Sequence, residues 1–568
     1  TELSPHQQSI IDKAEFKHYM PWRTAEKLDS ISTPYRMVVD ASMTGLNDIL
    51  AKGENNMTKI NHILIRNRCR RFVWSSDISK LYNQLHLKDS ALPYGLFLFD
   101  ENMDPDVPPQ VYVMLVAWYG VSSTGNQSAE GLERLVTLVQ DQYPAAVDVI
   151  KVDRYVDDVL SGGNTKEQVD CQVNETTAAL KEGGFNLKFI VRSGEEPCEE
   201  ASNDGKSLKV LGYKWATKED LLSPGFSEIN FSKRRRGSKR PNPFPVVNPE
   251  DIHKLLDGTQ ITRRMVTSKI AELWDPVGLW EPYKLQLKLD NRMLKGIDWD
   301  TALDEDMQTH WRARFEQFLQ IPQMTVNRCV IPHDTVNPNR VRLLCISDAA
   351  EHAGGCAIYA GYQRHDGSYS CQLLTARSKL MSQKKIPRNE LEGVKLMAET
   401  ASTVVSALGD MVEEVLYFTD STIAMCWCHN TSKKLRIFTL YRVADIRRHI
   451  FSACSIQDGK TLPLYHIDGT LNVADLLTKG HNISPEDIGV GSVWQDGLPW
   501  MKMNLKSMPI TTFAQIAFSQ EEETIINEEC FPELILSKDQ QQASVHLTTQ
   551  WLGPLGSHCE GCHPAPAL

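Results

Sequence analysis

Short runs of apolar and β-branched residues, separated by polar or glycine-containing turns, recur through the first 215 residues and predict a series of β-strands. Two stretches between them have helical spacing instead. One extends from Glu130 to Tyr143, and the other can be capped by Asn164 or Thr165 and ended by Gly183-Gly184. The predicted strands cover residues 35–40, 72–77, 111–116, 154–163, 185–191 and 209–215. This order of strands and helices predicts an α/β domain.

A second α/β pattern begins near residue 341, after a region with helical periodicity. That periodicity stops at Asp275-Pro276 and resumes from Tyr283 to Leu294. The elements predicted beyond it are strands that end at Asp348 and Asp420 and a long helix that opens at Pro387. The chain therefore carries two α/β patterns joined by a helical region.

Two adjacent carboxylates, Asp157 and Asp158, fall at the predicted turn of the 154–163 hairpin. Ionised carboxylates on one turn repel each other unless a hard dication that prefers oxygen, such as Mg²⁺, lies between them. A metal pair in such a place aligns a nucleophile and a phosphate leaving group. A solvated turn is the commoner explanation of an Asp-Asp pair alone, so the chemistry depends on what the rest of the chain supplies.

The tetrapeptide Tyr155-Val156-Asp157-Asp158 between apolar strands resembles the polymerase motif of reverse transcriptases. An apolar strand that ends at Asp77 and runs into a short helix resembles the first aspartate motif of the same family. The resemblance implies that Asp77, Asp157 and Asp158 are catalytic and hold the metal ions.

The same resemblance implies nucleotide contacts. Arg36 would touch the triphosphate of the incoming nucleotide, and Tyr82 would block a ribose 2′-hydroxyl. Tyr119 and Gly120 would pack under the nucleotide and the template, although this chain has Trp-Tyr-Gly where the family usually has Pro-Phe-Gly. The structural alternatives are a surface arginine on an edge strand and a tyrosine of the core. Lys209–Trp215 is similar to the primer-grip hairpin of the family.

Four further acids stand at strand ends or helix starts, in the order Asp348, Glu390, Asp420 and Asp475. A single acid in such a place is usually a cap or a surface charge. As a set, the four resemble the carboxylates of a ribonuclease H domain, which hold two metals. The resemblance implies two Mg²⁺ or Mn²⁺ ions in each of the two active sites, and it makes His466 a candidate for assisting the nuclease.

Composition sets limits on the partners. The formal net charge of -11 argues against a uniformly basic nucleic-acid binder, but binding needs only a local basic track. The basic run Lys233–Arg240 has three explanations: a solvated loop, a phosphate contact or a nuclear signal. The stretch Lys433–Arg448 would hold a hybrid backbone or form a solvated helix.

The 13 cysteines lack a framework spacing, which predicts reduced thiols. No apolar run reaches membrane-spanning length, and the start of the chain has no secretory signal.

Asp275-Pro276-Val277-Gly278-Leu279 and the following 297–300 narrow the resemblance to the Pao/BEL group of long-terminal-repeat retrotransposons. We therefore expect an α/β (α+β) multidomain protein, a right-hand polymerase followed by a ribonuclease H-like domain. The expected parts are fingers and palm over 1–222, thumb and connection over 223–335, the ribonuclease H-like domain over 336–482, and a post-nuclease segment over 483–568. The polar tail of this last segment, from about 505, is expected to be poorly ordered.

Cys559 and Cys562 lie too close to His558 and His563 to make a tetrahedral zinc site easily.

The resemblance implies an RNA-directed DNA polymerase with ribonuclease H activity. The expected partners are an RNA template, a DNA primer, the RNA–DNA hybrid, dNTPs and other polyprotein products such as protease, integrase and capsid, without a membrane. The expected location is intracellular, in a cytoplasmic virus-like particle or the nucleus. A decayed copy that binds nucleic acid without turnover is the alternative. An aspartic peptidase is disfavoured because the chain has no Asp-Thr-Gly or Asp-Ser-Gly.

Overall fold

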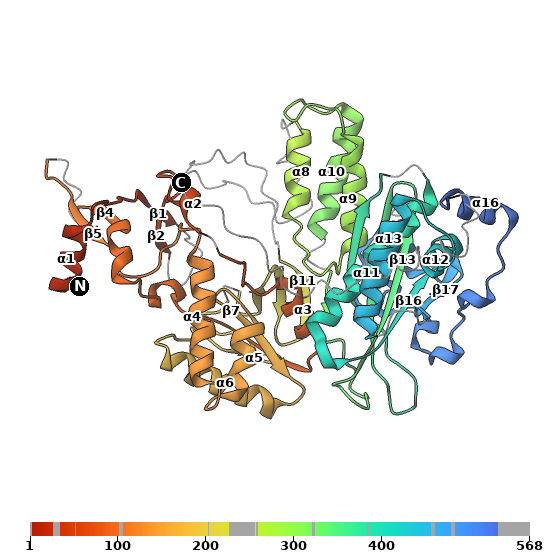
Figure 1. Ribbon diagram of the computed structural model, residues 1–568, viewed down its shortest axis with the longest axis horizontal. Coiled ribbons are helices and arrows are strands. Elements are labelled where there is room, and N and C mark those ends of the chain that lie inside the picture. The colour runs from red at the N-terminus through yellow and green to blue at the C-terminus, as the bar shows by residue number, and fades with distance from the viewer. Residues whose placement is uncertain are drawn as a thin grey trace, which may run out of the picture.

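The computed structural model describes residues 3–26, 34–51, 53–100, 106–202, 204–225, 256, 260–320, 324–382, 385–455, 461–478 and 483–531. The basic run 233–240 and the pair Cys559 and Cys562 lie outside these residues. Small sheets near the N-terminus occupy one end of the molecule, and a long five-stranded sheet with its helices occupies the other (Figure 1). Helices α8 (Arg263–Glu272), α9 (Glu281–Met293) and α10 (Glu305–Gln320) rise between the two ends (Figure 1).

Asp77 and the turn at Asp157-Asp158 belong to one antiparallel sheet of order β6-β7-β3-β8. Its strands are β3 (Phe72–Asp77), β6 (Arg154–Tyr155), β7 (Asp158–Gly163) and β8 (Val191–Arg192). The helices α4 (Thr124–Val139), α5 (Pro144–Val152) and α6 (Lys166–Glu182) pack with it around a core that includes Trp74 and Val159. Thr165 caps α6, because its side chain accepts a hydrogen bond from the Gln168 amide.

The strand predicted over 185–191 is shorter in the structure. Only Val191–Arg192 pairs with β3 as a strand, and the rest of the segment touches the sheet through an isolated bridge between Ile78 and Leu187. The Ser76 hydroxyl donates to the Phe189 carbonyl, so a side chain takes the place of a ladder bond there.

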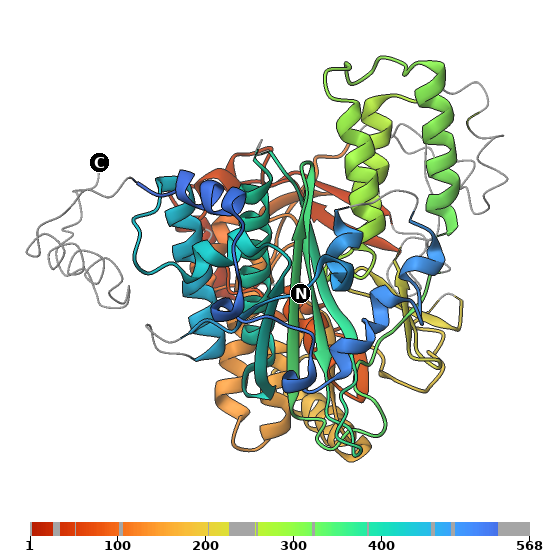
Figure 2. The same ribbon diagram turned by 90° about the vertical axis from the view of Figure 1, so that its right-hand side faces the viewer.

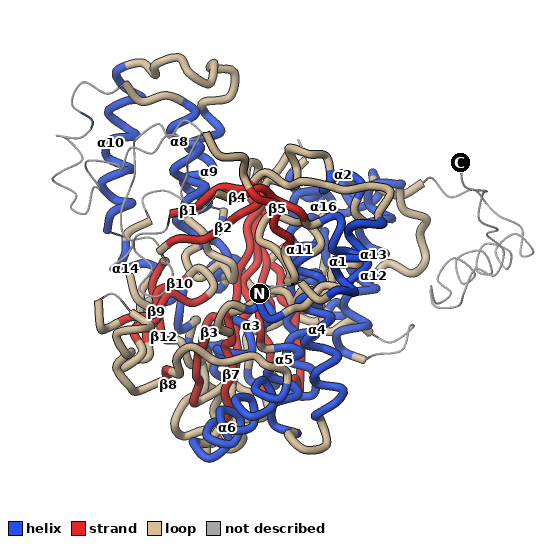
Figure 3. Tube along the Cα trace, turned by 90° about the vertical axis from the view of Figure 1, so that its left-hand side faces the viewer, coloured by secondary structure: helices blue, strands red, loops and turns tan. Residues whose placement is uncertain are grey.

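Two small hairpins and a third sheet complete the first half. The hairpins pair β1 (Trp22–Glu26) with β2 (Tyr35–Val39) and β4 (Leu96–Phe99) with β5 (Gln110–Val113). They lie with the short helices α1 (Pro5–Lys13) and α2 (Leu46–Ile49) at one end of the molecule (Figure 1), which is the end that faces the viewer in Figure 3. The third sheet contains β9 (Ser207–Val210), β10 (Tyr213–Ala216), β11 (Leu221–Pro224) and β12 (Val326–Asn327). The helical region consists of α8 (Arg263–Glu272), α9 (Glu281–Met293) and α10 (Glu305–Gln320).

The second α/β pattern folds into a five-stranded sheet of order β15-β14-β13-β16-β17 (Figure 2). Its strands are β13 (Val341–Ala349), β14 (Ala353–Gly361), β15 (Gln372–Leu380), β16 (Val412–Thr419) and β17 (Leu464–His466). The first three pair antiparallel, whereas β13, β16 and β17 pair in parallel. Its helices are α11 (Ile386–Leu408), α12 (Thr422–His429) and α13 (Ile437–Cys454). Parallel neighbours present their carboxyl ends at the same edge, so residues that follow β13 and β16 are brought together.

The two halves share a core at a seam formed by α3 (Ile60–Arg68). Arg68, which is 1% exposed, donates to the carbonyls of Leu373 and Leu374 on β15. Arg328, equally buried, forms an ion pair of 2.6 Å with Asp220 and donates to the Asn67 carbonyl. The Arg68 hydrogen bonds therefore fix β15 of the second half against α3, and the Arg328 hydrogen bonds hold the end of α3 beside the third sheet. The helical region does not hold the two halves apart.

Residues 505–531, which were expected to be poorly ordered, are folded in the structure. They form two 3₁₀ turns and α16 (Gln520–Glu528), which lies beside α12 at the far end of the molecule (Figure 1). Glu529 is 3% exposed and accepts two hydrogen bonds from Arg388, at 2.9 and 2.7 Å. The polar composition was misleading because these acids are paired with basic residues of the five-stranded domain. Within the described residues, no helix is long and apolar enough to cross a membrane.

Candidate active sites

The first carboxylate cluster consists of Asp77, Asp157 and Asp158. Asp77 ends β3 and is the direct cross-strand partner of Asp158 at the start of β7. One carboxylate oxygen from each of the three residues lies within 4.8 Å of the other two. Carboxylate oxygens are the ligands that Mg²⁺ and Mn²⁺ prefer, so the cluster could hold such an ion.

The turn that carries Asp157 has an unusual backbone. Val156 has a φ of 54°, a left-handed conformation that β-branched residues rarely adopt. The Asp157 carbonyl accepts a hydrogen bond of 2.8 Å from the Ile78 amide, which follows β3. The Val156 carbonyl accepts one of 2.6 Å from the Arg154 guanidinium. Sequence reasoning missed Arg154, because an arginine before an apolar strand gives no sign that it will be buried.

The predicted nucleotide contacts lie next to this cluster. The rings of Tyr82 and Tyr119 are in contact, with centroids 4.9 Å apart. Burial raises the pKa of each phenol, and Asp157 raises both further, while Arg36 opposes the rise at Tyr119. Both rings therefore lie close enough to Asp157 for its charge to affect the phenols, and Arg36 of β2 lies close enough to affect Tyr119.

Gly120 has a structural reason to be glycine. Its φ is +109°, and an added Cβ would stand 2.0 Å from the Val39 carbonyl oxygen. The Asn47 amide donates to the Gly120 carbonyl at 3.0 Å and accepts from the Ser122 amide at 2.8 Å. The turn is thus fixed against β2, the strand of Arg36.

The second carboxylate cluster consists of Asp348, Asp420 and Asp475, whose nearest carboxylate oxygens lie within 4.8 Å of one another. Asp348 lies near the end of β13, Asp420 directly follows β16, and Asp475 lies in the 3₁₀ turn Val473–Leu477. Burial, together with the neighbouring acids Asp420 and Asp475, raises the pKa of Asp348 to about 7. Burial also raises the pKa of Asp420, and Asp475 adds to this rise. Such crowded acids favour a bound cation.

Glu390 stands beside this cluster, near the start of α11. Its Oε2 accepts a hydrogen bond of 2.6 Å from the Ser421 hydroxyl, the residue after Asp420. Burial raises the pKa of Glu390, and Asp420 contributes to the rise. Glu390 is not one of the three acids whose oxygens meet within 4.8 Å. Glu390 nevertheless lies close enough to Asp420 for that acid to raise its pKa.

Two polar residues that sequence reasoning did not assign, Thr478 and Asn472, support the second cluster, and His466, which it did assign, lies beside them. The Thr478 hydroxyl donates to the Asp348 carboxylate. The Asn472 amide donates to the Ser347 carbonyl at 3.1 Å, and its hydrogen bond with Asp420 lowers the pKa of that acid. His466 Nε2 lies 3.1 Å from the Asp420 carbonyl oxygen, which places the histidine at the cluster. Asn472 has a local signal, since it caps the turn that carries Asp475.

The basic stretch at 433–448 is largely engaged within the chain. Arg442 pairs with Glu392 at 2.7 Å, and Arg447 donates to the Cys428 carbonyl at 2.9 Å. Lys433 donates to Asn527 at 2.8 Å. These contacts leave a weaker case for a continuous phosphate-binding track than the sequence suggested.

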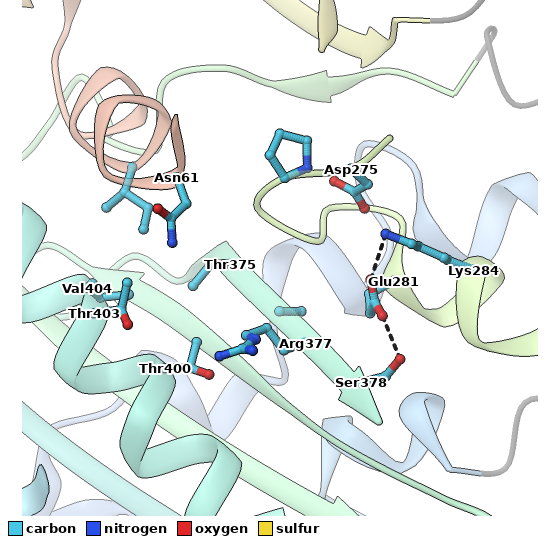
Figure 4. A pocket seen from close by; sticks show the side chains of 13 residues that line it. Asn61, Asp275, Glu281, Lys284, Thr375, Arg377, Ser378, Thr400, Thr403 and Val404 are labelled. Atoms are coloured by element: carbon cyan, nitrogen blue, oxygen red, sulfur yellow. Dashed lines mark hydrogen bonds and ion pairs between the residues drawn. The ribbon is translucent and has the colours of Figure 1, made fainter. Parts of the chain in front are cut away.

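A polar cavity of about 390 Å³ lies at the seam, apart from both clusters (Figure 4). Residues of α3, the α8–α9 loop, β15 and α11 line it. Glu281 there accepts from Ser378 at 2.5 Å and pairs with Lys284 at 3.9 Å. Gly278, in the same loop, approaches β15 so closely that a Cβ would stand 1.9 Å from the Ala376 carbonyl oxygen. Neither carboxylate cluster lines the cavity.

Comparison with known proteins supports the resemblance for one segment. Residues 262–421 match a family model described as the Pao retrotransposon-like RNaseH-like domain. The match covers α8 to α10 and includes Asp348, Glu390 and Asp420, and it ends before Asp475. This segment is thus similar to an RNase H-like domain of the Pao retrotransposon type. The search of curated proteins gave no match.

Among solved structures, the chain is similar to a foamy viral protease-reverse transcriptase dRH in complex with double-stranded DNA. The sequence identity is 13%, and the TM-score is 0.45. The alignment covers 79% of this chain and 65% of the viral one. At this TM-score the likeness does not define a shared fold.

Proposed function

We propose that the chain is an RNA-directed DNA polymerase with ribonuclease H activity. The observation that supports this most directly is the presence of two separate three-carboxylate clusters on one chain, one in each half. Two-metal sites activate an attacking oxygen and stabilise the charge on the leaving oxygen of a phosphoryl transfer. The second cluster lies in the segment with the RNase H-like match, apart from Asp475.

At the proposed polymerase site, Asp77, Asp157 and Asp158 would hold the metal ions. The β6-β7-β3-β8 sheet would act as the palm, with the β1–β2 and β4–β5 hairpins as fingers and α8 to α10 as the thumb. Arg36 would bind the triphosphate, because a guanidinium suits phosphate oxygens. Tyr82, packed against Tyr119, would lie below the sugar and reject a 2′-hydroxyl.

At the proposed nuclease site, Asp348, Asp420 and Asp475 would hold the metal ions with Glu390. Burial raises the pKa of Asp348, Glu390 and Asp420, and the neighbouring acids add to the rise, so a divalent cation would relieve a repulsion that already exists in the protein. Ser421 would hold Glu390 in place, and Thr478 would orient Asp348.

The two activities complement each other, because copying RNA into DNA leaves a hybrid whose RNA strand must be removed. The proposed substrates are an RNA template, a DNA primer, dNTPs and the resulting hybrid. Protease, integrase and capsid products of a retrotransposon polyprotein are the proposed partners, in an intracellular particle. The polymerase activity, the substrates and the partners are proposals that go beyond the RNase H-like match of residues 262–421.

One assay tests both activities together. A DNA primer is annealed to an RNA template whose 5′ end carries a label, and the full chain is added with dNTPs and Mg²⁺. We expect the primer to lengthen and the labelled RNA to shorten, and EDTA should stop both. A decayed copy would bind the duplex without either product, and this result would refute the proposed function.

A further inference from the structure

Arg154 is buried directly beneath the turn of the first carboxylate cluster. The residue is 7% exposed, yet it carries a charged group that the proposed reaction does not use. Its Nη1 donates to the Val156 carbonyl at 2.6 Å, and its Nε donates to the Ile150 carbonyl at 3.2 Å. Burial lowers the pKa of Arg154 to about 10, so the side chain stays protonated at neutral pH. A buried charge of this kind needs a structural or functional reason.

The turn above Arg154 needs an external support. Val156 is β-branched and has a φ of 54°, and such a residue does not adopt this conformation without surrounding contacts that impose it. The Ile78 amide holds the Asp157 carbonyl from β3, and the Arg154 guanidinium holds the Val156 carbonyl from below. The two consecutive carbonyls of the turn are thus fixed by separate donors.

The position of Asp157 depends on this turn. Asp77 and Asp158 are set by the register of β3 and β7, because they are direct cross-strand partners. Asp157 belongs to neither strand and reaches the cluster only because the chain turns at Val156. A turn that relaxed at Val156 would move Asp157 while Asp77 and Asp158 stayed in place.

We propose that Arg154 is a positioning residue for DNA synthesis, which holds the Val156 carbonyl so that the left-handed turn keeps Asp157 in the first carboxylate cluster. This inference rests on the proposed polymerase function and names a residue on which that site depends. Arg154 acts through the backbone of the turn, and it has no role in the second cluster. The competing explanation is that Arg154 only fills the core and ties β6 to α5 through the Ile150 carbonyl.

A double-mutant cycle with Val156 separates these explanations. Arg154→Met keeps most of the volume but removes the charge and both donors. Val156→Gly removes the need for support, since glycine adopts a positive φ without steric cost. Primer extension and hybrid cleavage are measured for the full-length wild type, for each single variant and for the double variant. Hybrid cleavage reports folding, because the second cluster lies in the other half of the same chain.

We expect Arg154→Met to lower kcat for primer extension about 10- to 100-fold, since a displacement of roughly 1 Å can cost this much. The KM for dNTPs should stay within about twofold, and hybrid cleavage should be unchanged. In the Val156→Gly background, the same Arg154→Met change should cost less than about threefold. Arg154→Lys should lose less than Arg154→Met, because an ammonium keeps one donor for the Val156 carbonyl.

Besides an unchanged rate of primer extension, two results would overturn the inference. One is an equal loss of extension from Arg154→Met in both backgrounds, and the other is a parallel loss of hybrid cleavage in a folded protein. If Arg154→Met does not fold, the same cycle with Arg154→Lys decides, and its loss must again shrink beside Val156→Gly. A wild-type chain that cannot extend a primer would instead refute the proposed function. A wild type and an Arg154→Met variant with equal extension would refute only the role of Arg154.

Discussion

Asp77 and Asp158 stand directly opposite each other across the antiparallel strands β3 and β7. Like charges in this relationship destabilise a sheet by about 0.2–1 kcal/mol, unless a cation lies between them. We therefore predict that Asp77→Asn abolishes primer extension and raises the melting temperature of the metal-free chain slightly. Primer extension and thermal unfolding in EDTA measure the two effects.

A matched control for Asp77→Asn is Asp141→Asn, since Asp141 is exposed and lies outside both clusters. It should change neither quantity. Asp157→Asn should also abolish extension, because it removes a charged ligand of the proposed metal site and keeps the shape. Near-normal extension by Asp77→Asn or Asp157→Asn would remove the polymerase assignment.

Tyr82 is predicted to control the choice of sugar. Its ring is fixed against Tyr119 beside the first carboxylate cluster, so truncation to alanine opens space next to the proposed nucleotide. Tyr82→Ala should incorporate ribonucleotides at least about tenfold more readily than the wild type, which corresponds to about 1.4 kcal/mol. Tyr82→Phe keeps the ring and should discriminate normally. If Tyr82→Ala discriminated as the wild type does, Tyr82 would be only a core residue.

Asp348 makes the metal-free chain sensitive to pH. Its pKa is raised to about 7, well above its ordinary value, so the folded state binds a proton that the unfolded state releases. The stability contributed by this proton is present below about pH 4 and is lost as the pH rises towards 7. Mg²⁺ should therefore stabilise the protein much more at pH 8 than at pH 5.

The variant Asp348→Asn resembles the protonated acid at every pH and can still accept from Thr478. In EDTA at pH 8 it should be more stable than the wild type by about 2–4 kcal/mol, and at pH 4 the two should be equal. Urea unfolding at both pH values measures this difference. A wild type that is as stable at pH 8 as at pH 4 in EDTA would contradict the raised pKa.

The acids could be found from the sequence because each stands where a recognisable local pattern ends. Asp77 and Asp348 stand at or near the ends of apolar strands and Asp420 directly follows one, and such strands deliver their last residues to one edge of a sheet. Their supporting residues could not be found in the same way. Arg68 contacts a carbonyl 305 positions away, and Arg388 contacts Glu529 at a separation of 141. Tertiary packing alone decides these contacts, and no local periodicity reports them.

Composition also misled where charges are paired. The segment 505–531 reads as polar and was expected to be poorly ordered, yet its acids meet basic side chains of the five-stranded domain. The basic stretch at 433–448 reads as free for phosphates, yet Arg442 is paired with Glu392. A count of charges along the chain does not show which charges neutralise each other in space.

The two proposed sites should be separable by Glu390→Gln. Glutamine keeps the volume and can still accept the Ser421 hydrogen bond, but it lacks the negative charge that would balance bound cations. Hybrid cleavage should fall by at least about 100-fold, while primer extension stays within about twofold. Ser421→Ala, which leaves the charge but removes the hydrogen bond, should cost less. Loss of both activities in a folded Glu390→Gln protein would mean that the two halves do not act independently.

Glu529 is predicted to make the C-terminal segment a necessary part of the nuclease. Its carboxylate accepts from Arg388, in the same helical turn as Glu390, and from the Thr439 hydroxyl at 2.8 Å. Removing one partner of a buried ion pair leaves an uncompensated charge and costs about 3–5 kcal/mol. Glu529→Ala should therefore lower the free energy of unfolding by this amount and reduce hybrid cleavage. Glu523→Ala on the exposed side of α16 should do neither.

Truncation gives an independent test of the same segment. A chain ending at residue 531 should keep full hybrid cleavage, whereas one ending at 504 should lose it, because Arg388 is then buried without its carboxylate. Primer extension serves as the reference, since the first carboxylate cluster does not contact the segment. Full hybrid cleavage by the chain that ends at 504 would show that the nuclease is complete without residues 505–531, and that the contacts of Glu529 only fasten a terminal segment to its surface.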